Sequence, residues 1–166
     1  MNLSEKLSLK RQIEEMYVLD QKSRKLAGGN RNELFYNILV YLVDNIHYFR
    51  IKEMIERHGY PTRKSLGVAC LKKFWLLIQH QDSNSLLQKK CLENCDFAPK
   101  EKAYLTDRIF VNQGKKQIYG TQFYRKAGKL IPRPIKDRKN LDKLRKSVGL
   151  DSFISYQKEF KNRIKT

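Results

Sequence analysis

Long apolar runs, paired cysteines and acidic residues are all scarce in this 166-residue chain. No stretch approaches the roughly 18 consecutive apolar residues of a membrane helix, which argues against an integral membrane protein. The first residues, MNLSEKLSLK, carry charges where a secretory signal places its apolar stretch, so we expect a cytoplasmic protein. Three cysteines do not build a disulfide framework. With no metal-ligand spacing, P-loop or dinucleotide fingerprint, we expect no metal and no cofactor.

Charge of one sign dominates, because 35 Lys and Arg stand against 17 Asp and Glu, a formal charge of +18. Residues 115–146, here called the basic segment, hold 12 basic residues and only two acids. Such a field attracts polyanions, and Tyr119, Phe123 and Tyr124 could stack on the bases of a nucleic acid. A solvated, lysine-rich surface explains the same charge without any ligand. Both interpretations stay open.

The composition, with 40 % hydrophobic and 11 % aromatic residues, supports one hydrophobic core and a single domain over residues 1–166. Apolar residues at three- and four-residue steps predict a mainly α-helical bundle. Strand formers at 117–125, a Gly-containing turn and residues 130–135 predict one short β-hairpin at about 116–135. The expected helices cover residues 2–27, 31–58 (one helix, or two bent near 47–50), 65–81, 84–95, 99–111, 140–148 and 152–163.

Polar residues interrupt the apolar stripe of the first expected helix. The stripe runs into Asp20 and Arg24, which are spaced i,i+4 and can therefore pair, with Gln21 beside them. An inward-facing ion pair is costly unless it is well hydrogen-bonded, and such costs are often found at functional sites. A pair at the rim of the helix is the alternative.

The third expected helix ends its apolar run in Gln79-His80-Gln81-Asp82. His80 follows Leu76 by four residues and so continues a buried stripe. An imidazole in such a place, near a carboxylate, can act as general base or acid, or it can simply be hydrogen-bonded. Asp82 would orient His80 only if the helix has already ended.

A third group of polar residues joins Asp107 and Arg108 to the segment 117–122. Strand alternation would place Gln117, Tyr119 and Thr121 on one face, and Gln122 on the other unless Gly120 marks a bulge. Such side chains can hydrogen-bond a polar substrate without adding charge. An amphipathic hairpin with a wet face is the alternative.

At these residues the chain resembles a widespread bacterial family of unknown function, recognised by a Gln-His-x-Asp and a Gln-x-Tyr-Gly-Thr-Gln motif. The motifs correspond to residues 78–82 and 117–122. The family usually has Trp where Tyr60 stands and often Asn where His47 stands. The resemblance supplies candidate residues and no reaction. Other segments of the chain also match the family and occur in the same order as in the family. They lie at residues 20–24, 58–61, Gly67, Gln88, 103–109, 131–135 and 144–150.

The first hypothesis is therefore a small enzyme with one polar pocket, a metal-independent hydrolase or transferase. Its substrate would be an anionic small molecule or macromolecule that carries a phosphate or a carboxylate. The alternatives are a nucleic-acid-binding module, which the basic segment favours, and an immunity-type or other protein-interaction partner. The catalytic candidates are His80, Asp82 and Asp107, and the substrate-binding candidates are Asp20, Gln21, Arg24, Gln79, Arg108, Gln117, Tyr119, Thr121 and Gln122.

Overall fold

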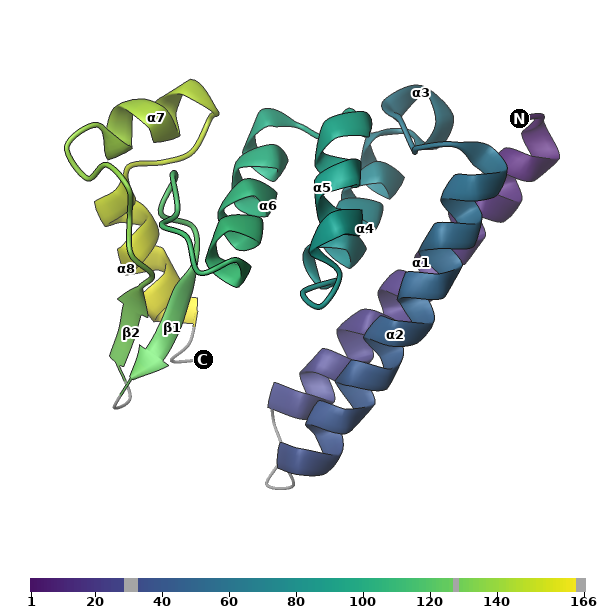
Figure 1. The fold of residues 1–166 in the computed structure, drawn as a ribbon. Coiled ribbons are helices and arrows are strands. Elements are labelled where there is room, and N and C mark those ends of the chain that lie inside the picture. The colour runs from purple at the N-terminus through teal and green to yellow at the C-terminus, as the bar shows by residue number, and fades with distance from the viewer. Residues whose placement is uncertain (29–32, 127–128, 164–166) are drawn as a thin grey trace. The chain divides into compact units, whose positions relative to one another are not determined.

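The computed structural model describes residues 1–28, 33–126 and 129–163, in which helices predominate (Figure 1). The chain divides into two compact units, Met1–Phe97 and Ala98–Thr166. The mainly α-helical fold with one short β-hairpin is confirmed. The single domain over residues 1–166 stays a prediction. None of the described helices offers the length of apolar sequence that crossing a bilayer requires.

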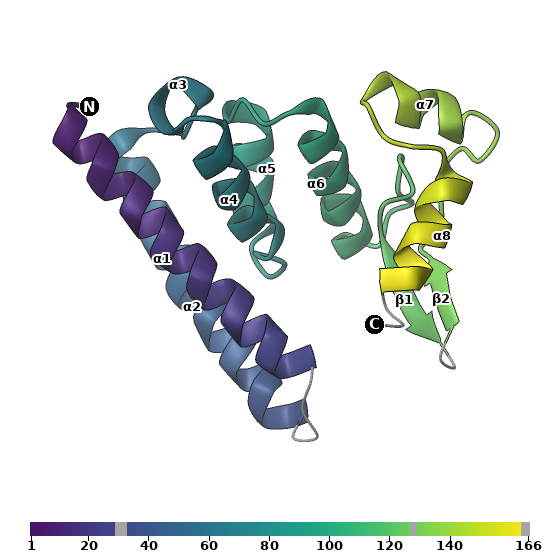
Figure 2. The same cartoon turned by 180° about the vertical axis from the view of Figure 1, so that it is seen from behind.

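The first unit is built on two long helices that lie side by side (Figures 1 and 2). Its described helices are α1 (Leu3–Gly28), α2 (Glu33–His58), α3 (Arg63–Leu66), α4 (Val68–Gln79) and α5 (Ser85–Asn94). α1 also packs against α4. Because apolar residues recur at helical spacing on each element, they form one shared core. It includes Ile13 and Met16 of α1, Ile51 of α2, and Phe74, Leu77 and Ile78 of α4.

The expected helix at 31–58 agrees with the structure, whereas the one at 65–81 differs from it. α2 runs unbroken through residues 47–50, so the first stretch is one helix and not two. The segment 65–81 instead holds two helices, α3 and α4, which are separated at Gly67. Gly67 has φ +76°, a conformation that glycine adopts without steric cost. Because α4 ends at Gln79, His80 is already the C-cap residue.

The second unit joins helices to the hairpin. Its described elements are α6 (Pro99–Asn112), β1 (Phe123–Lys126), β2 (Lys129–Pro132), α7 (Leu141–Ser147) and α8 (Phe153–Arg163). β1 and β2 are antiparallel, with Phe123 opposite Pro132. The ring of Phe123 stacks on that of Phe153, with centroids 6.2 Å apart, so the hairpin is packed against α8.

The expected strand at 117–125 is largely wrong, because only its last residues, Phe123 to Arg125, pair with β2. Gln117 forms a single parallel bridge with Ile135, and Gln122 accepts the backbone N–H of Arg133. Between these two contacts the chain forms a loop in which backbone N–H groups bond a side chain of α6 in place of a neighbouring strand. Gly120 has φ +68°, and a Cβ atom there would lie 2.8 Å from a ring carbon of Phe153. The loop therefore needs glycine at this position for conformation and for space.

This close approach makes Gly120→Ala more destabilising than Gly114→Ala, the matched control. Gly114 has a similar φ of +71° but open space around its Cα. We expect about 1–2 kcal/mol of destabilisation at Gly114 from the left-handed backbone alone. At Gly120 the clash adds about 1–3 kcal/mol. Denaturant titrations measure both, and equal losses would contradict the packing of Gly120 on Phe153.

Candidate functional site

A polar cluster in the first unit is built around the carboxylate of Asp20, whose side chain is 1 % exposed. Oδ1 of Asp20 lies 3.0 Å from Nε of Arg24, one helical turn further along α1, so the i,i+4 pair faces inward. Nδ1 of His80, at the end of α4, lies 2.8 Å from the same oxygen. The amide of Gln21 donates to Oδ2 at 2.8 Å. Three side chains from two helices thus surround one buried carboxylate.

The proton on His80 is assigned from these distances, because Nδ1 also lies 2.8 Å from Nε of Arg24. Without a proton, Nδ1 would accept from Arg24 but would face the Asp20 carboxylate lone pair to lone pair. A buried carboxylate needs donors, and Nε of Arg24 already has Oδ1 of Asp20 as an acceptor. We therefore assign Nδ1–H as a donor to Asp20. This tautomer leaves Nε2 as the basic nitrogen of His80.

Asp44 extends the cluster from α2, although the sequence analysis did not select it as a site residue. Nη2 of Arg24 lies 2.6 Å from Oδ1 of Asp44, so one guanidinium group bridges two carboxylates. The amide of Gln81 donates to the backbone carbonyl of Asp44 at 3.0 Å. A signal for Asp44 is present in the sequence, because it is the only charged residue in the stretch 34–49.

The two carboxylates of the cluster differ in pKa. Burial acts to raise the pKa of Asp20, but the hydrogen bond of His80, the charge of that ring when it is protonated, and the charge of Arg24 prevail and hold it below its usual value. Burial raises the pKa of Asp44 above its usual value in spite of Arg24. Asp20 is therefore the firmly ionised member of the pair.

A small pocket of about 50 Å³ opens beside this cluster. Asp44, His80, Gln81, Asp82 and Asn84 are among the residues that line it. Asp82 therefore shares the pocket with His80, but the carboxylate in contact with the imidazole is Asp20. The side chain of His80 is 14 % exposed, so the ring lies between the buried carboxylate and the pocket.

The predicted residues of the first unit are only partly brought together. Asp20, Gln21, Arg24 and His80 are in mutual contact, as described above. Gln79 is buried, and its Nε2 has no hydrogen-bond partner within the described residues. Sequence reasoning missed six residues that line the pocket, namely Tyr41, Asp44, Asn45, Gln81, Ser83 and Asn84.

In the second unit, the carboxylate of Asp107 is fully buried and organises the loop 117–122. It accepts the backbone N–H groups of Ile118 at 2.7 Å, Tyr119 at 3.0 Å and Thr121 at 2.9 Å. The hydroxyl of Thr121 also donates to it, at 3.0 Å. Burial raises the pKa of Asp107, and these donors lower it in part. The contacts hold the loop in place, while a catalytic role of Asp107 stays a prediction.

The two glutamines of this motif also bond within the loop. The amide of Gln117 donates to the backbone carbonyls of Gln122, at 3.1 Å, and Arg133, at 2.8 Å. Its oxygen accepts the backbone N–H of Gln122 at 2.8 Å. Arg108 lies half-buried on α6. Substrate contacts by these residues, and the sharing of one pocket by all the candidates, stay predictions.

Some side chains of the basic segment make contacts within the second unit. Arg145 is buried, and its guanidinium donates to the backbone carbonyls of Tyr119 and Asp151, each at 2.6 Å. Arg133 lies over the ring of Tyr124, 4.8 Å from its centroid. These groups are therefore engaged before any ligand binds, and nucleic-acid binding by the segment stays a prediction.

Within residues 1–28, 33–126 and 129–163 no group of three or more His, Cys, Asp or Glu side chains is arranged to hold a metal ion. Cys70, Cys91 and Cys95 are free thiols.

The fold and the cluster together define a mainly helical protein with a buried Asp–His–Arg constellation supplied by α1 and the end of α4. The chain belongs to the family of unknown function DUF6624, whose family model matches residues 39–163. Asp44, His80 and Asp107 lie within the matched residues, whereas Asp20 and Arg24 precede them. No curated protein and no solved structure matches the chain.

Another histidine, His47 on α2, is electrostatically coupled to the cluster. It is 1 % exposed, and its Nε2 has no hydrogen-bond partner in the described part of the chain. Burial lowers the pKa of His47 from the usual 6.5 to about 4, although the charge of Asp20 acts in the opposite direction. Unfolding exposes the ring, so between about pH 6.5 and pH 4 the unfolded state binds more protons. Stability due to His47 is therefore complete above pH 6.5 and is lost as the pH falls.

We expect His47 to reduce the free energy of unfolding by about 2 kcal/mol between pH 7 and pH 5. His47→Gln should remove this part of the pH dependence, because the amide does not titrate. His58→Gln, at an exposed position at the end of α2, is the control and should keep it. Denaturant titrations at the two pH values give the comparison. The same slope in His47→Gln as in the parent would show that His47 is not the group responsible.

The loop of the second unit gives a separate prediction. Asp107→Asn replaces one accepting oxygen by an NH2 group, which faces the N–H donors of the loop. We expect a loss of about 1.5–3 kcal/mol in the free energy of unfolding, the range for hydrogen bonds to charged groups. Asp151→Asn, at an exposed position, should stay within about 0.5 kcal/mol of the parent. Thermal and denaturant melts measure both, and an unchanged Asp107→Asn protein would mean that the carboxylate does not hold the loop.

Proposed function

We propose that the chain is a hydrolase or transferase in which His80 is the general base and acid and Asp20 is its positioning residue. The observation that carries the proposal is the 2.8 Å contact between Nδ1 of His80 and the buried carboxylate of Asp20. A carboxylate in this position fixes the tautomer and orientation of the ring and stabilises the imidazolium that forms during proton transfer. Nε2 is then the nitrogen that serves the pocket.

The proposed reaction begins when a water molecule or a substrate hydroxyl in the pocket gives a proton to Nε2 of His80. The oxygen attacks the substrate, and the imidazolium returns the proton to the leaving group, so the ring ends the cycle neutral. Proton transfer of this kind contributes about 10²–10⁴-fold to a rate. During the cycle the charge of the imidazolium is balanced by Asp20.

Arg24 has a positioning role in this proposal. Its Nε and Nη2 are already engaged with Asp20 and Asp44, so we assign it to holding the two carboxylates in place. The proposal that the substrate is anionic is supported by the formal charge of the whole chain, +18, which attracts phosphorylated or carboxylated molecules over long range.

Activity assays test the proposal directly. The substrates are p-nitrophenyl phosphate, bis(p-nitrophenyl) phosphate and p-nitrophenyl acetate, which report phosphomonoester, phosphodiester and carboxylester hydrolysis. His80→Asn keeps an amide that can donate to Asp20 but lacks a base, so we expect the rate to fall by about 10²–10⁴-fold. His58→Gln is the control. Turnover of none of the three esters, or equal turnover by His80→Asn and the parent, would count against the proposal.

The state of the imidazole is a second, independent readout. In ¹⁵N-resolved spectra we expect neutral His80 to carry its proton on Nδ1, because Asp20 accepts from that nitrogen. Asp20→Asn presents an amide in place of the carboxylate and should shift the proton toward Nε2 while activity falls. A proton on Nε2 in the parent would contradict the assigned roles.

A further inference from the structure

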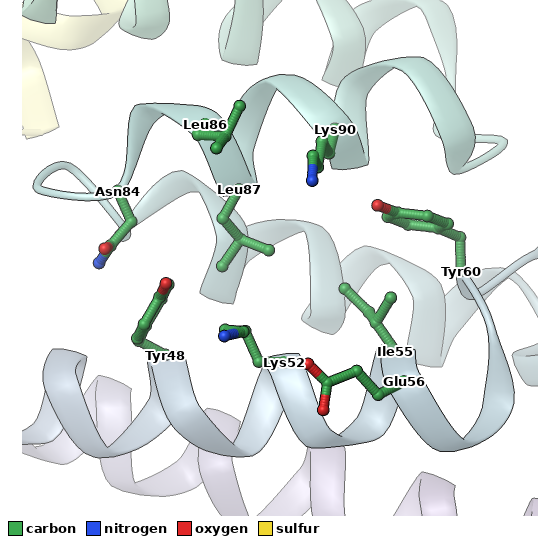
Figure 3. A pocket seen from close by; sticks show the side chains of 9 residues that line it. All are labelled: Tyr48, Lys52, Ile55, Glu56, Tyr60, Asn84, Leu86, Leu87 and Lys90. Atoms are coloured by element: carbon green, nitrogen blue, oxygen red, sulfur yellow. The ribbon is translucent and has the colours of Figure 1, made fainter.

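A second, larger cavity in the first unit lies between α2 and α5 (Figure 3). Its volume is about 320 Å³, at the small end of the roughly 300–1,000 Å³ typical of ligand pockets. Asn84 lines both this cavity and the small pocket of His80, so the two spaces share a wall. The cavity is therefore the immediate neighbour of the pocket that His80 lines.

The walls of the cavity combine rings, aliphatic side chains and ammonium groups. Tyr48 and Tyr60 supply aromatic surface, and Leu87 supplies a buried aliphatic surface. Lys52 of α2 and Lys90 of α5 enter the space from opposite walls (Figure 3). The cavity thus offers an apolar seat and two cations, the combination that fits a ring bearing an anionic group.

The two lysines bring two positive charges to one cavity. Within the described residues neither Lys52 nor Lys90 has a carboxylate at ion-pair distance, and Nζ of Lys52 lies 5.9 Å from the centroid of the Tyr48 ring. Glu56 also lines the cavity, so the formal charge of its ionisable side chains is +1. Two ammonium groups that face one open cavity, against a single carboxylate, favour a ligand with more than one negative charge.

We infer that this cavity is the substrate seat and that it takes a phosphate monoester of a ring-bearing molecule. A phosphate monoester carries about −1.5 to −2 charges at pH 7 and offers three acceptor oxygens, enough for ammonium groups on opposite walls. The ring packs against Leu87 and the aromatic surface of the cavity. The inference deepens the proposed function and, in its link to His80 through Asn84, rests on it.

Binding to the full chain tests this inference without any need for turnover. The probe is phenyl phosphate, followed by calorimetry, with phenol and inorganic phosphate as the partial ligands. We expect phenyl phosphate to bind at least about tenfold more tightly than either, because only the complete probe meets both the apolar seat and the ammonium groups. No binding of phenyl phosphate at millimolar concentration, or equal binding of inorganic phosphate, would overturn the inference.

Substitutions locate the site. Lys52→Gln and Lys90→Gln should each weaken phenyl phosphate by about tenfold, since each removes a charge-assisted hydrogen bond. Lys89→Gln is the matched control, because Lys89 is the exposed neighbour of Lys90 on α5 and does not line the cavity. The affinity of Lys89→Gln for phenyl phosphate should stay within about twofold of that of the parent. Equal losses in Lys89→Gln and Lys90→Gln would reduce the effect to general electrostatics and contradict the site.

The His80→Asn variant separates this inference from the proposed function. His80→Asn should bind phenyl phosphate as the parent does while losing turnover of the chromogenic esters. If the parent binds no phenyl phosphate but shows turnover that depends on His80, the proposed binding site between α2 and α5 is wrong and the catalytic proposal holds. If phenyl phosphate binds through Lys52 and Lys90 but no turnover depends on His80, the site stands and the catalytic proposal fails.

Discussion

The desolvated carboxylate of Asp20 is the constraint on which the rest of the first unit depends. A buried charge is costly unless donors replace the water it has lost, and each donor here comes from a specific place. Arg24 and Gln21 follow from the helical spacing of α1, but His80 arrives only when the end of α4 packs against α1. Satisfying one carboxylate thus fixes the orientation of an imidazole sixty residues further along the chain.

The second unit uses the same physics for another purpose. Asp107 is also a buried carboxylate, yet its donors are mostly backbone N–H groups of the loop 117–122. Side-chain donors leave an imidazole beside a pocket, whereas backbone donors shape a loop. Two aspartates with similar burial therefore differ in what they can do, and the difference lies in the donors that surround them.

Most helices could be predicted from the sequence because helical periodicity is a local property. The Asp20–Arg24 pair followed from the i,i+4 rule for the same reason. The break at Gly67 and the loop 117–122 could not be predicted, because strand propensity in the loop is overridden by a carboxylate on α6. The partner of His80 and the part played by Asp44 depend on how α1, α2 and α4 meet. These contacts depend on tertiary packing, which no local sequence pattern specifies.

Arg145 has a consequence for how the second unit opens. Its guanidinium joins the carbonyl of Tyr119, in the loop, to that of Asp151, in the turn before α8. Separating either segment alone would strand a permanently charged group in an apolar setting, since arginine does not lose its proton. Loop and turn are therefore coupled into one cooperative block. A fluctuation that frees one segment removes one of the two carbonyl acceptors of this guanidinium, so the stability of the loop depends on that of the turn.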